Sequence, residues 1–454
     1  MKLRRILGSS GGMNALSSIM AILVGLLAGF IILLVSNPSQ AAAGFVTILT
    51  GGFSDMFNLG QVLYYSVPII MTGLSVGFAG KTGLFNIGAS GQFTFGMYAA
   101  ILAAVKCSFL PDPLRCLAAL LAGGFAGGLW GLIPGVLKAL RNVHEVIACI
   151  MMNYIGMYLV NQLIRTTGIF DQLRNTTVRV PSGANLPSLG LNTLFSTTTA
   201  QGVVRPSSVG SGILVVIASC IMLYIIIEKT KLGYELKSCG FNREAARYAG
   251  INENRGIMLS MGIAGGLAGF GGALVALAGA GRGIPVIDVL AGEGFQGIPV
   301  ALLGLYNPIG ILFTGILIAH LTQGGFLLQR LAFAPEIIEI IVSVIIYFSA
   351  LALLFKNALS IILRDKNEPT QILVDDDEPY EDEPQKEHEE NNESTDGIES
   401  VQSIQSNGSY DGTNSAKADD NSESVDSDTE NDSDESEVAQ NSDPAATGGD
   451  SDDS

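Results

Sequence analysis

Residues 81–96 read KTGLFNIGASGQFTFG, and the stretch lies between two long apolar runs that place it at membrane depth. It contains Gly83, Gly88, Gly91 and Gly96, although glycine inside a helix costs about 1 kcal/mol relative to alanine. Non-helical backbone is tolerated at this depth only where protein or a water-filled cavity covers it. The stretch therefore predicts an interrupted helix of the kind that forms solute sites in transporters. Close helix packing through small residues is the alternative.

A second glycine-rich interruption, GEGFQG at 292–297, also lies between apolar runs. Paired interrupted helices in two halves of a chain point to the solute site of a transporter. Polar side chains in these two stretches, and an amide deep in the apolar run 144–164, are the candidates for contact with a solute, although an intramembrane amide can instead bond a neighbouring helix. The predicted translocation-path residues are Asn86, Ser90, Gln92, Asn153 and Gln296.

Charge divides the chain into two parts. Of its 454 residues, 48% are hydrophobic and 15% are charged. Residues 1–364 hold 22 basic and 12 acidic residues, whereas residues 365–454 hold 3 basic and 30 acidic residues. The second part is too polar to bury enough surface to offset its ordering entropy. We therefore expect a transmembrane domain at 1–364 and a disordered acidic tail at 365–454.

Apolar runs of about 20 residues predict an all-α membrane protein with about ten spans. The run from Ala15 to Val35 is longer than the 7–15 residues usual in a signal peptide, which favours a first membrane helix. The glycine-broken segment 43–60 is expected to form a half-helix at the interface. The other expected spans are 61–80, 84–105, 116–137, 144–164, 212–228, 256–279, 288–305, 308–323 and 336–355.

Basic residues predict the orientation, because cytoplasmic loops carry the excess of Lys and Arg. With ten spans and a cytoplasmic N-terminus, 15 basic residues through position 366 lie inside and 8 lie outside. The dense cluster at 229–255 falls inside. Both termini are therefore expected in the cytoplasm, and the polar connection 165–211 on the outer face is a candidate docking surface.

Motifs for enzyme chemistry are missing from the sequence. Gly80-Lys81-Thr82 resembles the end of a phosphate loop, but Ser75 stands where that motif needs glycine. His144 opens HEVIA, but Ala148 replaces the second histidine of a zinc-protease helix. We expect no catalytic residues, metal, cofactor or nucleic-acid partner, and the lipid bilayer as the surroundings.

The cytoplasmic loop 229–255 differs from the others because it can fold. Residues 242–249 can form a short helix that Asn242 caps and Gly250 ends. Its small alanines suit a groove on another protein, whereas an amphipathic surface helix is the simpler interpretation.

Four blocks of sequence, in order, resemble motifs of the permease subunits of ABC importers. These importers form the class for branched-chain amino acids, simple sugars and nucleosides, and the resemblance is strongest to the nucleoside-type permeases. The resemblance covers about 1–355. The blocks are TGLFNIGASGQ (82–92), HEVIACIMMNYIG (144–156), GFNREAARYAGI (240–251) and GIPVALLGLYNPIG (297–310).

This resemblance implies a pore of two like or unlike permeases, cytoplasmic ATPase subunits and an extracellular solute-binding lipoprotein. It implies import of a nucleoside or similar small polar solute, with a simple sugar as the alternative. A secondary transporter would need more buried ionisable residues, and a membrane scaffold is a third interpretation. The resemblance also makes 240–251 the coupling helix, with contacts from Gly240, Asn242, Ala245, Ala246, Tyr248 and Gly250.

Overall fold

The computed structural model describes residues 10–199, 201–279, 282–351 and 354. The described chain is a helical bundle, which confirms the all-α membrane prediction, with two small hairpins in addition. The predicted tail at 365–454 lies outside the described residues. The helices at the ten predicted spans are α2 (Ser10–Ser36), α4 (Met56–Lys81), α5 (Ala89–Lys106), α6 (Asp112–Arg141), α7 (Glu145–Thr166), α9 (Gly212–Lys229), α12 (Glu253–Ala276), α13 (Gly292–Leu303), α14 (Pro308–Leu327) and α15 (Pro335–Ala350).

Seven of these helices are long and apolar enough to cross a membrane, namely α2, α4, α6, α7, α9, α12 and α14. The other three predicted spans correspond to the shorter or less apolar helices α5, α13 and α15. The expected span at 288–305 is wrong as a complete span: α13 has 12 residues and is only about 18 Å long, against a hydrocarbon core of about 30 Å.

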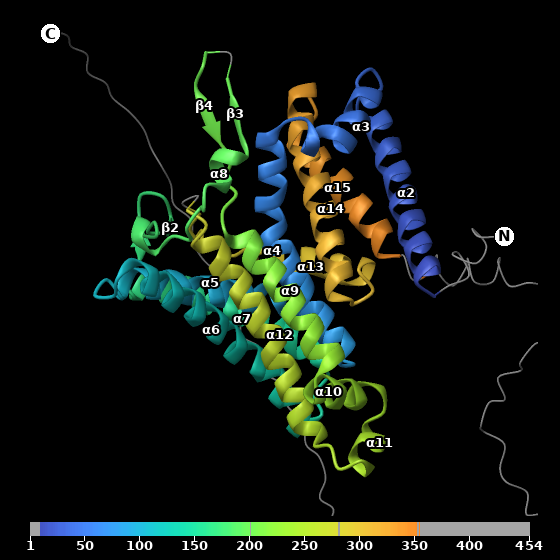
Figure 1. Ribbon diagram of the computed structural model, residues 1–454, viewed down its shortest axis with the longest axis vertical. Coiled ribbons are helices and arrows are strands. Elements are labelled where there is room, and N and C mark those ends of the chain that lie inside the picture. The colour runs from blue at the N-terminus through green and yellow to red at the C-terminus, as the bar shows by residue number, and fades with distance from the viewer. Residues whose placement is uncertain (1–9, 200, 280–281, 352–353, 355–454) are drawn as a thin grey trace, which may run out of the picture. The chain divides into compact units, whose positions relative to one another are not determined.

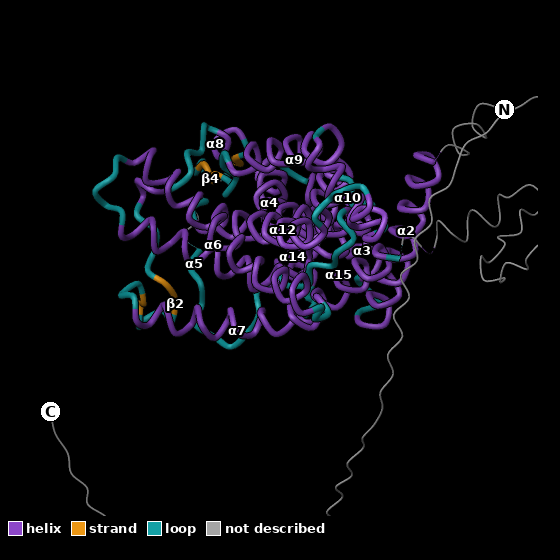
Figure 2. Tube along the Cα trace, turned by 90° about the horizontal axis from the view of Figure 1, so that it is seen from below, coloured by secondary structure: helices purple, strands orange, loops and turns teal. Residues whose placement is uncertain are grey.

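Central and peripheral helices differ in burial. The apolar window of α4 is 83% buried, whereas that of α2 is 22% buried. Figure 2 shows α12 and α14 running through the middle of the bundle, with α7 and α9 at opposite edges. The helices at the edges therefore present a face that no other described helix covers.

Glycines hold α6 and α12 in direct backbone contact. Gly127 faces Gly265 and Gly269, and a Cβ built on Gly127 would lie 2.6 Å from the Cα of Gly269. Gly131 meets Gly265 in the same way, at 2.8 Å from its Cα. Small residues allow such close approach between membrane helices. We call this contact the glycine seam.

The two ends of the bundle carry different structures (Figure 1). One end carries the β3–β4 hairpin of the 165–211 connection together with α3, which is followed by a 3-10 turn within the expected half-helix segment, and the β1–β2 hairpin lies at the side of the bundle beside α5. The opposite end carries α10 and α11, so the folded loop 229–255 lies far from the hairpins. The remaining elements are α3 (Ala41–Thr50), η1 (Gly51–Phe53), β1 (Phe170–Asp171), β2 (Thr176–Thr177), η2 (Ser182–Ala184), α8 (Leu191–Leu194), β3 (Ser196–Thr198), β4 (Val204–Pro206), α10 (Lys231–Phe241), α11 (Arg243–Tyr248) and η3 (Leu328–Leu331).

Candidate functional site

The two glycine-rich stretches predicted from the sequence meet in the structure. Helix α5 begins at Ala89 after a non-helical segment, and α13 begins at Gly292 after another. A Cβ on Gly294 would overlap the backbone of Ser90, so the first turns of the two helices touch directly. The Ser90 hydroxyl also donates a hydrogen bond of 2.8 Å to the carbonyl of Ala291. The two similar stretches therefore contact each other at the starts of α5 and α13.

The interruption is shorter than the sequence suggested. Backbone outside regular helix is confined to residues 82–88. Gly91 and Gly96 lie inside the continuous helix α5, where they allow close approach to Asn153 and Gly269. For these two glycines, the packing interpretation is the right one.

Helix α13 begins deep inside the bundle. The hydroxyl of Thr72 donates to the carbonyl of Glu293 at 2.9 Å, and Thr72 lies about 24 Å along α4 from Met56. Residues 282–291 thus descend toward the middle of the bundle without forming a helix. Irregular backbone at such depth is tolerated where it lines a cavity or is covered by protein.

A cavity of about 140 Å³ lies beside this descending segment. Its walls come from α5, α7 and residues 282–293, and they combine apolar side chains with a few polar groups. The lining residues are Phe93, Thr94, Met97, Met157, Asn161, Arg282, Gly283, Ile284, Pro285, Ile287, Val289, Leu290, Ala291 and Glu293.

Polar contacts fix one wall of the cavity. The Asn161 amide donates to the carbonyl of Ile287 at 3.0 Å and to the carboxylate of Asp288 at 3.1 Å. Arg282 and Glu293 form an ion pair across the segment. A solute in this cavity would meet hydrogen-bonding groups and both signs of charge.

A buried amide cluster supports the start of α5. The amides of Asn86 and Gln92 exchange two hydrogen bonds, of 2.8 and 3.0 Å. Asn86 also donates to the hydroxyl of Ser75 at 3.0 Å and accepts from the backbone of Gly88 at 3.1 Å. Asn86 is 0% exposed and Gln92 is 1% exposed. These bonds satisfy backbone and side-chain groups that the interruption would otherwise leave unpaired.

Asn153 connects α7 to the same interruption. Its carbonyl oxygen accepts from the backbone of Gly91 at 2.8 Å, and its amide donates to the carbonyl of Ile87 at 3.0 Å. The side chain is 1% exposed. Asn153 therefore bonds a neighbouring segment, which is one of the two roles that an intramembrane amide can have.

At the other end of the bundle, α10 and α11 form the predicted folded loop. Asn242 accepts a 3.0 Å hydrogen bond from the backbone of Ala245 and caps α11. Gly250 has φ +77°, in the left-handed region that favours glycine after a helix. Tyr248 is 94% exposed. Ala246, expected on the contact face, is instead 3% exposed and packs against its own chain.

Gly240 connects this loop to the interrupted stretch. A Cβ on Gly83 would overlap the backbone of Gly240, and Gly83 has φ +71°. A Cβ on Gly240 would lie 2.5 Å from the carbonyl carbon of Thr82. The end of α10 thus rests on the turn that leads into the buried amide cluster.

Comparison with protein families assigns the chain. Residues 58–350 match the family described as branched-chain amino acid transport system / permease component. The chain belongs to this family. It is therefore a multi-pass membrane permease and a transport subunit.

The permease is similar to several named transporter permeases. It is 36% identical over 338 residues to the guanosine ABC transporter permease protein NupP of Bacillus subtilis, covering 74% of this chain and 93% of the relative. It is 32% identical over 352 residues to the nucleoside ABC transporter permease protein NupB of Lactococcus lactis, covering 76% and 93%. It is 32% identical over 350 residues to the glucose ABC transporter permease protein TsgB13 of Haloferax volcanii, covering 75% and 88%.

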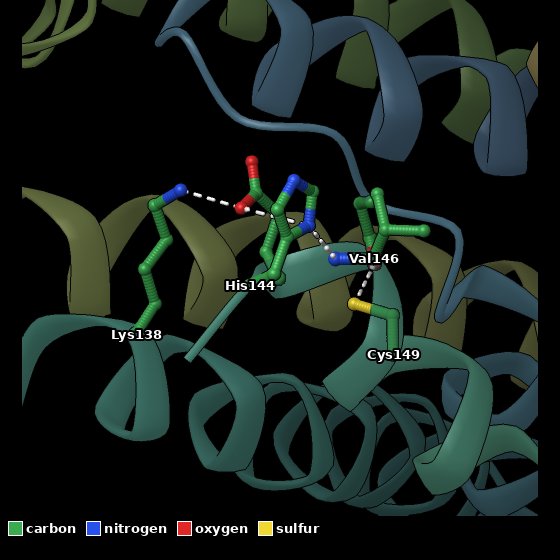
Figure 3. Close-up of polar contacts among 6 residues, drawn as sticks. Lys138, His144, Val146 and Cys149 are labelled. Atoms are coloured by element: carbon green, nitrogen blue, oxygen red, sulfur yellow. Dashed lines mark hydrogen bonds and ion pairs between the residues drawn. The ribbon is translucent and has the colours of Figure 1, made fainter. Parts of the chain in front are cut away.

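In the permease, an ion pair closes the turn between α6 and α7 (Figure 3). Lys138, in the last turn of α6, contacts the carboxylate of Glu145 at 2.5 Å, and both side chains are largely buried. The ring of His144 accepts from the backbone of Val146 at 3.3 Å and caps α7. Glu145 thus pairs with a lysine besides lying at the positive end of the helix dipole.

The five predicted path residues differ in their surroundings. Asn86, Ser90, Gln92 and Asn153 are buried and hydrogen-bonded, whereas Gln296 is half-buried and has no hydrogen-bond partner in the described part of the chain. Their contact with a solute stays a prediction. Thr94 and Arg282 also line the cavity and could not be predicted from the sequence, because only the folded chain brings residues 282–293 against α5 and α7.

Proposed function

We propose that this permease forms the membrane path of an ATP-driven importer for a nucleoside. The observation that carries the proposal is the similarity to the guanosine permease NupP, which extends over 93% of that relative. The family match at residues 58–350 includes both interruptions, the cavity and the loop 229–255.

The composition of the cavity is compatible with such a solute. A nucleoside has a flat base and a hydroxylated sugar. The apolar side chains of Met97 and Met157 can cover the base, while Thr94, Asn161 and the Arg282–Glu293 pair can bond polar groups. Pockets of this kind hold a ligand through apolar area and orient it through a few polar groups.

In this proposal, other subunits supply the energy of ATP hydrolysis and deliver the solute. A separate ATPase subunit docks on α10 and α11, whose exposed Tyr248 and Ala245 form a contact face. A solute-binding lipoprotein docks on the opposite end, at the 165–211 connection, and a second permease completes the pore. Both termini lie on the cytoplasmic side with α11.

The predicted path residues have two roles in this scheme. Ser90 and Gln296 lie at the contact between α5 and α13 and border the path. Asn86, Gln92 and Asn153 hold the non-helical turn in shape, so that motion of α10 against Gly83 shifts the start of α5.

Uptake by the complete complex tests the proposal. The permease is reconstituted in proteoliposomes with its ATPase, lipoprotein and second permease, and labelled guanosine and labelled glucose are compared. We expect ATP-dependent accumulation of guanosine that unlabelled nucleosides inhibit. The similarity to the glucose permease TsgB13 makes a sugar the second candidate, so ATP-dependent accumulation of glucose alone would overturn the nucleoside proposal.

A further inference from the structure

The irregular wall of the cavity is paired with the β1–β2 hairpin of the outer connection. The backbone N–H of Thr177 donates to the carbonyl of Ile284 at 3.0 Å. The N–H of Val286 donates to the carbonyl of Asn175 at 2.9 Å. These two bonds flank an antiparallel bridge, so residues 284–286 lie beside β2 as a third short strand.

Side chains of the hairpin add two further bonds to the wall. The Thr177 hydroxyl accepts from the backbone N–H of Ile284 at 3.1 Å, and the Asn175 amide donates to the carbonyl of Val286 at 3.0 Å. A Cβ built on Gly283 would lie 2.8 Å from the Thr177 hydroxyl, so the two chains approach closely. Both polar backbone groups of Ile284 and of Val286 thus find their partners in the hairpin, and such groups need partners when they are buried.

The hairpin is itself fixed next to the end of α7. Its base is closed by a 2.7 Å hydrogen bond from the N–H of Val178 to the carbonyl of Ile169, and Ile169 is 0% exposed. Its turn is closed by the carboxylate of Asp171, which accepts from the N–H of Leu173 at 3.1 Å. An isolated two-stranded hairpin is marginally stable at best. The buried base and the third strand therefore make the hairpin and the wall one unit.

This pairing determines which side chains of the wall face the cavity. Successive side chains of an extended strand point to opposite faces. The exposed residues Pro285, Ile287 and Val289 line the cavity, whereas Val286 is 4% exposed and packs in the core. A slip of one residue in the pairing would exchange the buried and the exposed side chains.

The second hairpin of the same connection does not contact the wall in this way. Strands β3 and β4 pair with each other, and no hydrogen bond within the described part of the chain joins them to residues 282–291. The two hairpins therefore differ in one respect that an experiment can use. Substitutions in β1–β2 reach the cavity wall, and equivalent substitutions in β3–β4 do not.

We infer that Thr177 and Asn175 are positioning residues of the solute cavity, which hold its wall in register. The inference rests on the proposed function and assigns part of its solute selectivity to two residues that do not line the cavity themselves. A pocket orients its ligand through a few groups at fixed positions. Release of the wall therefore changes which solutes fit.

Hydrogen exchange in the assembled complex, followed by mass spectrometry, tests the hold on the wall. Thr177→Val removes the hydroxyl at nearly constant side-chain size, whereas Thr177→Ser keeps the hydroxyl. We expect the amides of residues 283–287 to exchange about tenfold faster in Thr177→Val, because the Ile284 N–H loses its acceptor. Thr177→Ser should exchange like the unmodified permease. Thr198→Val, the same change in β3, should not alter exchange at 283–287.

The ratio of the uptake rates of two solutes tests the effect on the cavity. The ratio is measured in one proteoliposome preparation and does not depend on how many complexes are folded, and the same lipoprotein serves every variant. We expect the guanosine-to-cytidine ratio to shift by at least about threefold in Thr177→Val, because a displaced wall changes the fit of the two bases unequally. The ratio should stay the same in Thr177→Ser and Thr198→Val.

Asn175→Gly is the second variant, and it decides the question if Thr177→Val does not assemble. Asn175 is exposed and has φ +49°, a conformation that glycine adopts without strain, so the substitution removes mainly the bond to Val286. It should move exchange and the uptake ratio in the same direction as Thr177→Val. Unchanged exchange at 283–287 in both variants would overturn the inference.

Faster exchange with an unchanged uptake ratio would also overturn the inference, because the wall would then not contact the solute. Equal effects of Thr177→Ser and Thr177→Val would exclude the hydroxyl as the cause. If the complex imports glucose and no nucleoside, the ratio is measured with galactose as the second solute. That result removes the nucleoside proposal, while the positioning role of Thr177 is still decided by exchange and by the hexose ratio.

Discussion

Asn86 makes more polar contacts than any other side chain of the interrupted stretch. It bonds Gln92 twice, Ser75 once and the backbone of Gly88 once, in a site without solvent exposure. A buried polar group left without a partner costs about 1–3 kcal/mol. Removing Asn86 therefore affects several groups at once.

Asn86→Leu should lower the melting temperature of the purified permease and abolish uptake, because Gln92 and the Gly88 N–H lose their partners. Ser75→Ala is the matched control, since it removes one bond to Asn86 and one to the carbonyl of Ala264 and leaves the amide pair intact. We expect a clearly smaller drop for Ser75→Ala. Equal melting temperatures for the two variants would show that the amide pair contributes little to stability.

Tyr248 is the residue through which we expect the ATPase to be recognised. Tyr248→Ala should leave the melting temperature of the isolated permease unchanged, because the side chain is 94% exposed. In the complex it should reduce solute-stimulated ATP hydrolysis and co-purification of the ATPase, since aromatic side chains often dominate interface energies. Leu173→Ala is the control: Leu173 is 99% exposed but lies between β1 and β2 in the 165–211 connection, not in α10 or α11. Full stimulation with Tyr248→Ala would place the contact elsewhere.

At the scale of elements, α10 is linked to the start of α5 by the contact of Gly240 with Gly83. Gly240→Ala would force a Cβ against the backbone of Thr82, and overpacking of this kind typically costs about 1–3 kcal/mol. We expect Gly240→Ala to weaken the stimulation of ATP hydrolysis by solute while the basal rate persists.

Gly292→Ala is the control for this substitution, because a Cβ on Gly292 meets no atom within 4 Å. It should leave solute stimulation unchanged. If both glycine variants behave like the unmodified permease, the contact at Gly240 does not transmit motion to α5.

The positions of the helices were predictable because long apolar runs leave few alternatives. The role of each glycine was not predictable, because glycine at membrane depth can either interrupt a helix or allow two helices to pack closely. Residues 82–88 are interrupted, whereas Gly91 is helical and packs against Asn153. The length of α13 was hidden for a similar reason, because the apolar run continues through a segment that is not helical.

The sequence pointed to polar residues in the interrupted stretch but not to what they contact. Asn86 and Gln92 are six residues apart, and only the turn between them allows their amides to pair. Ala246 was placed on the wrong face because a short helix has no clear apolar period.

At the scale of the whole molecule, the family match ends at residue 350, before the acidic region that begins at about 365. We expect truncation after residue 364 to leave membrane expression and uptake unchanged, because a segment rich in Asp, Glu and Ser has too little apolar surface to join a core. Fluorescence size-exclusion profiles and uptake rates of the full-length and truncated permeases provide the measurement. Loss of folded protein on truncation would contradict this expectation.

The glycine seam between α6 and α12 has a consequence for inheritance. Any single-nucleotide change that alters a glycine codon and encodes another amino acid introduces a Cβ, and at Gly127, Gly131, Gly265 and Gly269 that atom would overlap the facing backbone. Every single amino-acid substitution at these positions therefore disrupts the packing of α6 against α12, so no tolerated intermediate leads from glycine to another residue. The exposed apolar residues of α6 can exchange for one another without such overlap, so we expect neutral variation to accumulate on the outer face of the helix while its inner face stays the same.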